Sequence, residues 1–286
     1  MTITALRQAY HRRLFTEVIR FSQGRGGLEY PNFADAGNAG SMAIASHIIT
    51  QLGYEIGLGV IAGQTSGGRF ESATKDFLEA CFALLGHLRP GEWRYATYVP
   101  ISVFDQYAHL ATLSHLIQQY SELAATLGTD YIIKPDITVS RAPFAESDIN
   151  LYGEVVNLDE AIARLTPLRS ANSLEGRWIL HASISCKWTI RSDRAQNARA
   201  EALNLIRNRK GRLPHIVAVT AEPLPTRINS LALGTGDLDC VYHFALPELQ
   251  TAVAEVGNQD QREALAMLIG GRRLRDISDL PFDLMA

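Results

Sequence analysis

The spacing of apolar residues along the chain changes near residue 131. Before that point, four stretches repeat apolar residues at helical spacing, with Gly or Pro between them: 5–21, 41–52, 70–88 and 104–128. After it, four short stretches are rich in β-branched residues: 130–140, 178–188, 215–221 and 239–246. The pattern predicts a helical N-terminal half followed by buried strands.

A further helix is predicted between the second and third of these strands. It runs from about Asp193 to Arg209 and is closed by Gly211. A strand, a helix and a strand in succession form a crossover unit, which favours a mixed β-sheet with helices on its faces. No internal repeat or linker interrupts the chain, so we expect one α/β domain over residues 1–286.

Composition restricts the class of protein. Apolar residues make up 47% and charged residues 20% of the 286 positions, as in ordinary globular proteins. No apolar run approaches the roughly 20 residues that cross a bilayer, and no charged-then-apolar leader is evident, so we expect a cytoplasmic protein without a membrane partner. Cys81, Cys186 and Cys240 are odd in number and unpaired in spacing, which favours reduced, buried thiols.

Charge is unevenly distributed. The chain carries a net −3, but the segment from Lys187 to Arg212 holds eight basic and two acidic residues, so that segment is +6 and the remainder −9. A basic stripe on an acidic body is typical of a protein that meets nucleic acid on one face. A solvated helix face explains the same count equally well.

A nuclease-like pattern lies on the predicted strands. Hydrolysis of a phosphodiester needs carboxylates that hold Mg²⁺ and a positive group that offsets developing charge. Asp136 follows a proline on the first strand, and Lys187 ends the second, but Ser185 stands where the pattern needs a second acid. Glu201, two turns after Arg194 on the next helix, could supply that acid. An ordinary strand aspartate and an edge lysine remain the alternative.

The start of that helix carries candidate base-reading residues. Arginine binds O6 and N7 of guanine bidentately, and aspartate accepts from N4 of cytosine in the major groove. Arg191, Asp193 and Arg194 therefore suit two adjacent G·C pairs. Asp193 with Gln196 also fits a helix capping box, and both roles stay open.

Several long motifs resemble one known family. They are the segment 181–223, "LALGTGDLDCVYHFAL", "RLRDISDLPFDL", "GQTSGGRFE", "RPGEW", "QYAHL" and "AATLGTDYIIKPDI". Together they are similar to the NgoMIV-like type II restriction endonucleases, which read a CCGG core and belong to the PD-(D/E)-x-K nuclease superfamily. The resemblance implies a restriction-endonuclease-like fold, Mg²⁺ as cofactor, double-stranded DNA as partner, GCCGGC as the expected site, and a homotetramer holding two DNA copies.

The resemblance also implies roles for individual residues. Asp136 and the carbonyl of Cys186 would bind the metal, with Lys187, Glu201, Glu71 and Ser185 completing the catalytic set. Arg191, Asp193 and Arg194 would read the core, Gln64 would approach it from the minor groove, and Asp35 with Arg227 would read the outer pair. The alternative is a catalytically silent, sequence-specific DNA-binding protein of the same fold. The acids favour the enzyme, because a pure binder has no need of carboxylates beside phosphates that repel them.

Overall fold

Six strands form one mixed sheet in the order β3–β4–β5–β6–β7–β8. They span Trp93–Thr97 (β3), Ile137–Arg141 (β4), Ile179–Lys187 (β5), His215–Thr220 (β6), Cys240–His243 (β7) and Leu274–Asp276 (β8). β3 and β4 pair antiparallel, whereas β6, β7 and β8 pair in parallel. The predicted α/β class with a mixed sheet is therefore confirmed.

The structure is a computed structural model that describes two compact units. It describes the chain except residues 25, 26, 28, 121, 123–131, 174, 175, 191, 234 and 235. Of residues 192–195, only the backbone is described. Unit 1 comprises Met1–Leu88, Ile184–Ala202 and Ile216–Ala286, and unit 2 comprises Arg89–Ser183 and Leu203–His215. β5 and α7 (Ser192–Asn208) each run from one unit into the other. The single domain over residues 1–286 stays a prediction.

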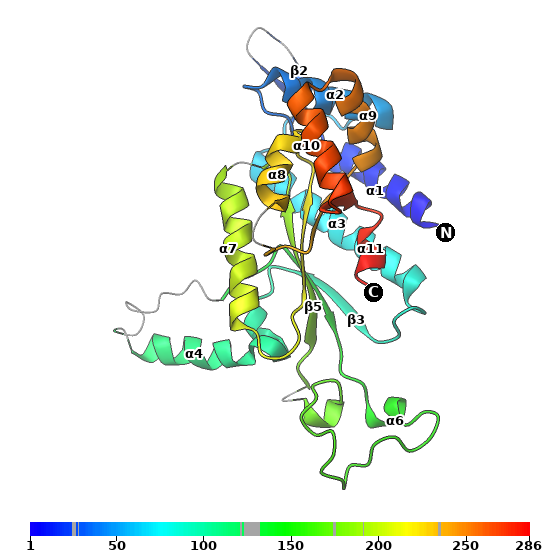
Figure 1. Cartoon of the computed structure of the whole chain (residues 1–286), viewed down its shortest axis with the longest axis vertical. Helices are drawn as coiled ribbons and strands as arrows, with labels where there is room; N and C mark the ends of the chain where they lie inside the picture. Colours follow the sequence, from blue (N-terminus) through cyan, green and yellow to red (C-terminus); the bar gives the residue numbers. More distant parts are fainter. Residues whose placement is uncertain are drawn as a thin grey trace. The chain divides into compact units, whose positions relative to one another are not determined.

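Helices of unit 1 pack in pairs. The pairs are α1 (Ile3–Glu17) with α3 (Gly63–Leu85), α2 (Ala39–Leu52) with α9 (Leu246–Val256), and α8 (Pro225–Ala232) with α10 (Gln259–Gly270). In Figure 1 the second and third pairs are seen side by side, and the short α11 (Leu280–Asp283) ends the chain. Thr2, Asn38 and Asn258 cap α1, α2 and α10 by accepting backbone N–H groups, which satisfies donors that a helix start leaves unpaired.

Unit 2 contains the β3–β4 pair and several short helices. These are η2 (Ile101–Val103), η3 (Asp105–Tyr107), α4 (Ala108–Gln119), α6 (Glu146–Ile149) and η4 (Ser170–Asn172). Gln106 binds both backbone groups of Leu180, donating to its carbonyl at 2.7 Å and accepting from its N–H at 2.9 Å. The hydroxyl of Tyr107 donates to the carbonyl of Leu205 at 3.0 Å. These buried bonds tie η3 to β5 and to the end of α7.

The hydrophobic pattern located most of the long elements. α1, α2, α3, α4 and α7 follow the expected helices, and Gly211 has the left-handed φ of +85° expected beyond a helix end. β4 begins only at Ile137, because Pro135 lacks the N–H that a strand ladder uses. The mainly helical first half also contributes β3 and the antiparallel ribbon of β1 (Phe21–Gln23) and β2 (Glu29–Pro31), which were not predicted. These strands are short and poor in β-branched residues, the feature that marked the predicted strands.

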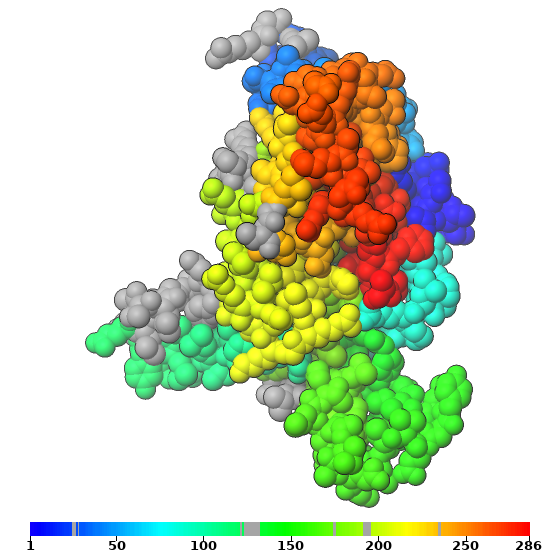
Figure 2. Space-filling view, in the orientation of Figure 1, coloured from blue at the N-terminus to red at the C-terminus, as the bar shows by residue number. Residues whose placement is uncertain are grey.

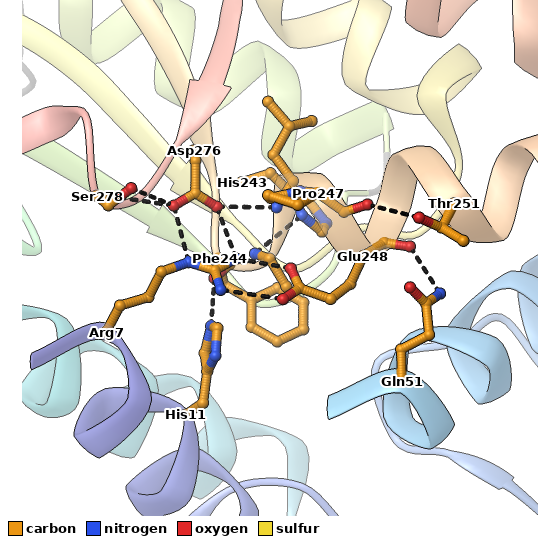
Figure 3. A network of polar contacts seen from close by, with 12 residues as sticks. Arg7, His11, Gln51, His243, Phe244, Pro247, Glu248, Thr251, Asp276 and Ser278 are labelled. Atoms are coloured by element: carbon orange, nitrogen blue, oxygen red, sulfur yellow. Dashed lines mark hydrogen bonds and ion pairs between the residues drawn. The ribbon is translucent and has the colours of Figure 1, made fainter. Parts of the chain in front are cut away.

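A partly buried polar network joins the N-terminal helix α1 to the rest of unit 1 (Figure 3). The Arg7 guanidinium of α1 donates to both oxygens of Glu248 on α9, at 3.0 and 2.6 Å, and to both oxygens of Asp276 on β8, at 2.9 Å each. Asp276 also accepts from the backbone N–H of Leu246 and from Ser278. Burial opposes its charge, but the hydrogen bonds from Arg7 prevail and hold the pKa of Asp276 below its usual value. We call this set the Arg7 triad.

Two further expectations concern the cysteines and membrane spans. Cys81, Cys186 and Cys240 are buried free thiols, as predicted, and burial raises the pKa of Cys81 to about 12 and of Cys240 to about 11. Among the described residues, no helix has both the length and the apolar character required to cross a membrane.

Candidate functional site

The candidate catalytic lysine is the last residue of β5. Side chains alternate along a strand, so Ser185 and Lys187 share one face and Cys186 takes the other. Ser185 and Cys186 are buried, and Lys187 is half-buried. The carbonyl of Lys187 accepts from the hydroxyl of Thr220 at 2.7 Å and from the N–H of Ala221 at 3.3 Å. These bonds fix the end of β5 against the end of β6.

An aromatic cluster supports the same region of unit 1. The ring of Trp188, the residue after the lysine, lies 5.5 Å from the ring of Phe33 and 5.0 Å from that of Phe70. Phe70 directly precedes Glu71 on α3, and Phe33 lies two residues before Asp35. Packing of these buried rings therefore restrains the backbone at both acidic side chains. This cluster was not predicted, because its members are far apart in the chain.

Of the four candidate metal ligands and catalytic acids, three lie in unit 1 and one lies in unit 2. Glu71 is buried on α3, and Glu201 is half-buried on α7; both belong to unit 1 with Cys186 and Lys187. Asp136 belongs to unit 2 and is half-buried in a bend. It immediately precedes β4, so its expected position within the strand is corrected by one residue. The backbone there is held by the N–H of Tyr98, which donates to the carbonyl of Pro135 at 3.2 Å.

The available donors decide which metals fit. Among the described residues, no three His, Cys, Asp or Glu side chains gather as a metal-binding cluster. Structural zinc needs such a set, whereas Mg²⁺ binds through one or two carboxylates and oxygen donors and keeps several waters. The thiol of Cys186 is buried on the face of β5 opposite Lys187, so its carbonyl oxygen is the suitable donor. A carboxylate such as that of Asp136 and a backbone carbonyl such as that of Cys186 are each oxygen donors of the kind that Mg²⁺ accepts.

The predicted core-reading residues are only partly described. Arg191 lies outside the described residues. Asp193 and Arg194 lie in the first turn of α7, but only their backbone is described. Gln64 is exposed in the first turn of α3. The capping role of Asp193 therefore remains an alternative to base reading.

The predicted outer readers come together, although 192 positions separate them. Arg227 of α8 donates to the carboxylate of Asp35, which lies in the loop between β2 and α2. Their side chains are 34% and 35% exposed, so both groups remain accessible to a ligand. They line a cavity of about 230 Å³ together with Tyr30, Asn32 and Thr189. A paired cation and anion at a polar cavity can present both a donor and an acceptor to a base pair.

A third charged residue lies behind this pair. The side chain of Glu222 is 1% exposed, and its Oε1 atom is 3.9 Å from Nη1 of Arg227. Its Oε2 accepts from the N–H of Ile190 at 2.9 Å, and Oε1 accepts from the N–H of Leu224 at 3.2 Å. Burial raises the pKa of Glu222 to about 7, against these hydrogen bonds and the charge of Arg227. We call Arg227, Asp35 and Glu222 the Arg227 triad.

Comparisons with known proteins agree over most of the chain. Residues 10–286 match the model of the family described as NgoMIV restriction enzyme. The chain is 47% identical over 286 residues to the type II restriction enzyme NgoMIV of Neisseria gonorrhoeae, covering 98% of each protein.

Two solved structures give weaker matches. The PspGI–substrate DNA complex matches with a TM-score of 0.35 and 15% identity, covering 78% of this chain and 61% of that one. Bse634I with cognate DNA matches with a TM-score of 0.34 and 11% identity, covering 96% and 99%. Because both TM-scores are below 0.5, neither match supports a conclusion about this chain.

Proposed function

Since the chain belongs to the NgoMIV restriction-enzyme family and is a type II restriction endonuclease, we propose that it hydrolyses both strands of DNA at GCCGGC in a Mg²⁺-dependent reaction. The observation that carries the proposal is the 47% identity across 98% of both chains. The family match over residues 10–286 spans every position of the candidate site. Because the proposed substrate is DNA inside a cell, the expected location is the cytoplasm.

The proposed metal ligands are Asp136 and the carbonyl of Cys186. Mg²⁺ bound there would supply Lewis-acid polarisation of the scissile phosphate and a more acidic water. Lys187 would place its ammonium group against the charge that develops on the phosphate during attack. Glu201 would provide the acid that Ser185 does not, and Glu71 a further carboxylate for orienting water.

Sequence recognition is assigned to side chains near the starts of helices. Arg191, Asp193 and Arg194 would read the CCGG core in the major groove, and Gln64 would contact its centre from the minor groove. Asp35 and Arg227 would read the outer pair as acceptor and donor. Support for this last assignment is their ion pair at a polar cavity, where their mutual contact can be exchanged for contacts to bases.

We also propose a homotetramer that binds two DNA copies. Support comes from a segment of unit 2, coloured green in Figure 2, whose apolar side chains face solvent. They are Leu151, Tyr152, Val155, Leu158, Ile162 and Leu165. Exposed apolar side chains gathered in one segment point to an interface more often than singly scattered ones do. Sedimentation equilibrium should give four times the 31.5 kDa chain mass, and Leu165→Ser with Ile162→Ser should lower it.

A digestion experiment tests the proposed reaction. Wild-type protein with MgCl₂ should cut a plasmid containing GCCGGC into discrete fragments, and excess EDTA should stop the cutting. A matched plasmid without any CCGG should stay intact. Lys187→Ala should lose cleavage by about 10²–10⁴-fold while keeping sequence-specific binding. Specific binding by the wild type without any cleavage would favour the catalytically silent binding protein instead.

A further inference from the structure

A buried glutamate lies where an apolar side chain would ordinarily be more stable. Glu222 occupies the turn between β6 and α8 in an otherwise apolar stretch, and only 1% of its surface is exposed. Burying a carboxylate costs free energy unless it is fully paired. Its two backbone bonds and the cation 3.9 Å away offset this cost only in part, because the pKa remains raised to about 7. A carboxylate kept at a cost to stability is a candidate for a functional role.

The partners of Glu222 connect two regions of the candidate DNA-reading surface. One oxygen binds the N–H of Ile190, the residue that precedes the first predicted core reader in the chain. The other oxygen binds the N–H of Leu224 at the start of α8 and faces Nη1 of Arg227. A single side chain therefore spans the backbone before α7 and the first turn of α8.

The geometry leaves Arg227 free to use its other edge. A guanidinium carries five N–H donors in a planar fork, and only Nη1 faces Glu222. Nη2 donates to Asp35, which is 35% exposed and can itself turn to a base. When Asp35 and Arg227 exchange their mutual bond for contacts to DNA, the carboxyl group of Glu222 remains behind the arginine.

We propose that Glu222 is a positioning residue that holds Arg227 in the orientation required to discriminate the outer base pair of the recognition site. This role rests on the proposed function, because it requires that Arg227 contacts that pair. Glu222 itself touches no base and acts through the arginine. The hydrogen bond from the N–H of Ile190 fixes the carboxyl group of Glu222 relative to the start of α7. The contacts to the outer base pair and to the core are therefore held at a fixed spacing.

The test compares cleavage of three duplexes that differ in one feature. They contain GCCGGC, ACCGGT with a changed outer pair, and GCATGC with a changed core; kcat/KM is measured with Mg²⁺. In Glu222→Gln, which keeps the size and one acceptor oxygen, preference for GCCGGC over ACCGGT should fall about tenfold. Preference for GCCGGC over GCATGC should change less than twofold. Glu248→Gln in the Arg7 triad is the matched control and should leave both preferences unchanged.

A double variant separates positioning from general structural damage. If Glu222 acts through Arg227, Glu222→Gln with Arg227→Ala should have the same outer-pair preference as Arg227→Ala alone. Additive losses, an unchanged outer preference, or an equal loss on all three duplexes would overturn the proposed role. A wild-type protein without preference for CCGG would overturn the proposed function as well. Cleavage by the wild type therefore shows whether the proposed function or only the role of Glu222 is wrong.

Discussion

The Arg7 triad and the Arg227 triad each place one arginine of unit 1 against two carboxylates, and they differ in exposure and pairing. In the Arg7 triad, four bonds of 2.6 to 3.0 Å join the guanidinium to Glu248 and Asp276, and the three side chains are 10% to 17% exposed. In the Arg227 triad, arginine and Asp35 are about one-third exposed, while the buried Glu222 is 3.9 Å away.

The pKa shifts of the carboxyl groups differ between the two triads in the same way. Hydrogen bonds from Arg7 hold the pKa values of Asp276 and Glu248 low in spite of burial, so that network favours the charged, folded state. Burial instead raises the pKa of Glu222 to about 7. Complete pairing makes the Arg7 triad a structural element that joins α1, α9 and β8. In the Arg227 triad, Arg227 and Asp35 are more exposed, and under the proposed function they change partners when DNA binds.

The largest expected effect concerns stability. Arg7→Met leaves two mostly buried carboxylates without their cation, so we expect the free energy of unfolding to fall by about 3–5 kcal/mol. Urea denaturation measures this change. Cleavage preference among recognition sites should be unaffected below the unfolding range. A loss under about 1 kcal/mol would show that the Arg7 triad contributes little to folding. The proposed difference between the Arg7 triad and the Arg227 triad would then be wrong.

The pH dependence of stability should have opposite signs in the two triads. Because the folded pKa of Glu222 is raised, its contribution is fully present below the unfolded value near 4.5 and is lost as pH rises through about 7. Glu222→Gln should therefore gain up to about 3 kcal/mol relative to wild type between pH 5 and 8.

Glu248→Gln provides the comparison for this measurement. The folded pKa of Glu248 is lowered, so its contribution is present above the unfolded value and is lost as pH falls through the folded one. This variant should be less stable than wild type at pH 7 and approach it at low pH. Parallel curves for the two variants would contradict the contrast between the triads.

Arg227→Ala should change recognition more than stability. Loss of a bidentate base contact lowers discrimination of the outer pair by about 1–3 kcal/mol, while an ion pair of this exposure contributes at most about 1 kcal/mol to folding. Relative cleavage rates on GCCGGC and ACCGGT measure the first quantity, and thermal unfolding the second. Uniform weakening on all sequences would identify a phosphate contact instead.

The smallest effect is expected at an exposed arginine that also faces two acids. Arg13 binds Glu17 and Asp76, but the three side chains are 32% to 43% exposed. Arg13→Ala should therefore change the free energy of unfolding by less than about 1 kcal/mol. A loss as large as that of Arg7→Met would mean that burial is not the property that separates these arginines.

Local pattern predicted most of the long elements, because amphipathic spacing reports burial directly, but it did not predict α9 or α10. It located the strand that ends at Lys187 and the helix that carries Glu201. It did not locate β1, β2, β3 or β8, which are short and poor in β-branched residues. Nor could it pair Asp35 with Arg227, because contacts over 192 positions depend on the tertiary fold.

Glu222 was missed for a different reason. A lone acid in "AVTAEPLP" matches no catalytic spacing, and its importance depends on bonds to Ile190 and Leu224 that exist only after folding. The available signal was an ionisable residue within an apolar run between a strand and a helix. Such residues are rarely buried without a partner, which makes them worth examining before a structure is known.

Sequencing the fragment ends from one digest tests the central claim most directly. The substrate is a duplex library with eight randomised base pairs, digested by the wild-type protein in MgCl₂, with an EDTA-treated sample as control. Cuts should occur in both strands at sites with a CCGG core, and GCCGGC should be the most frequent of them. Ends spread over unrelated sequences, or a different core, would contradict the account.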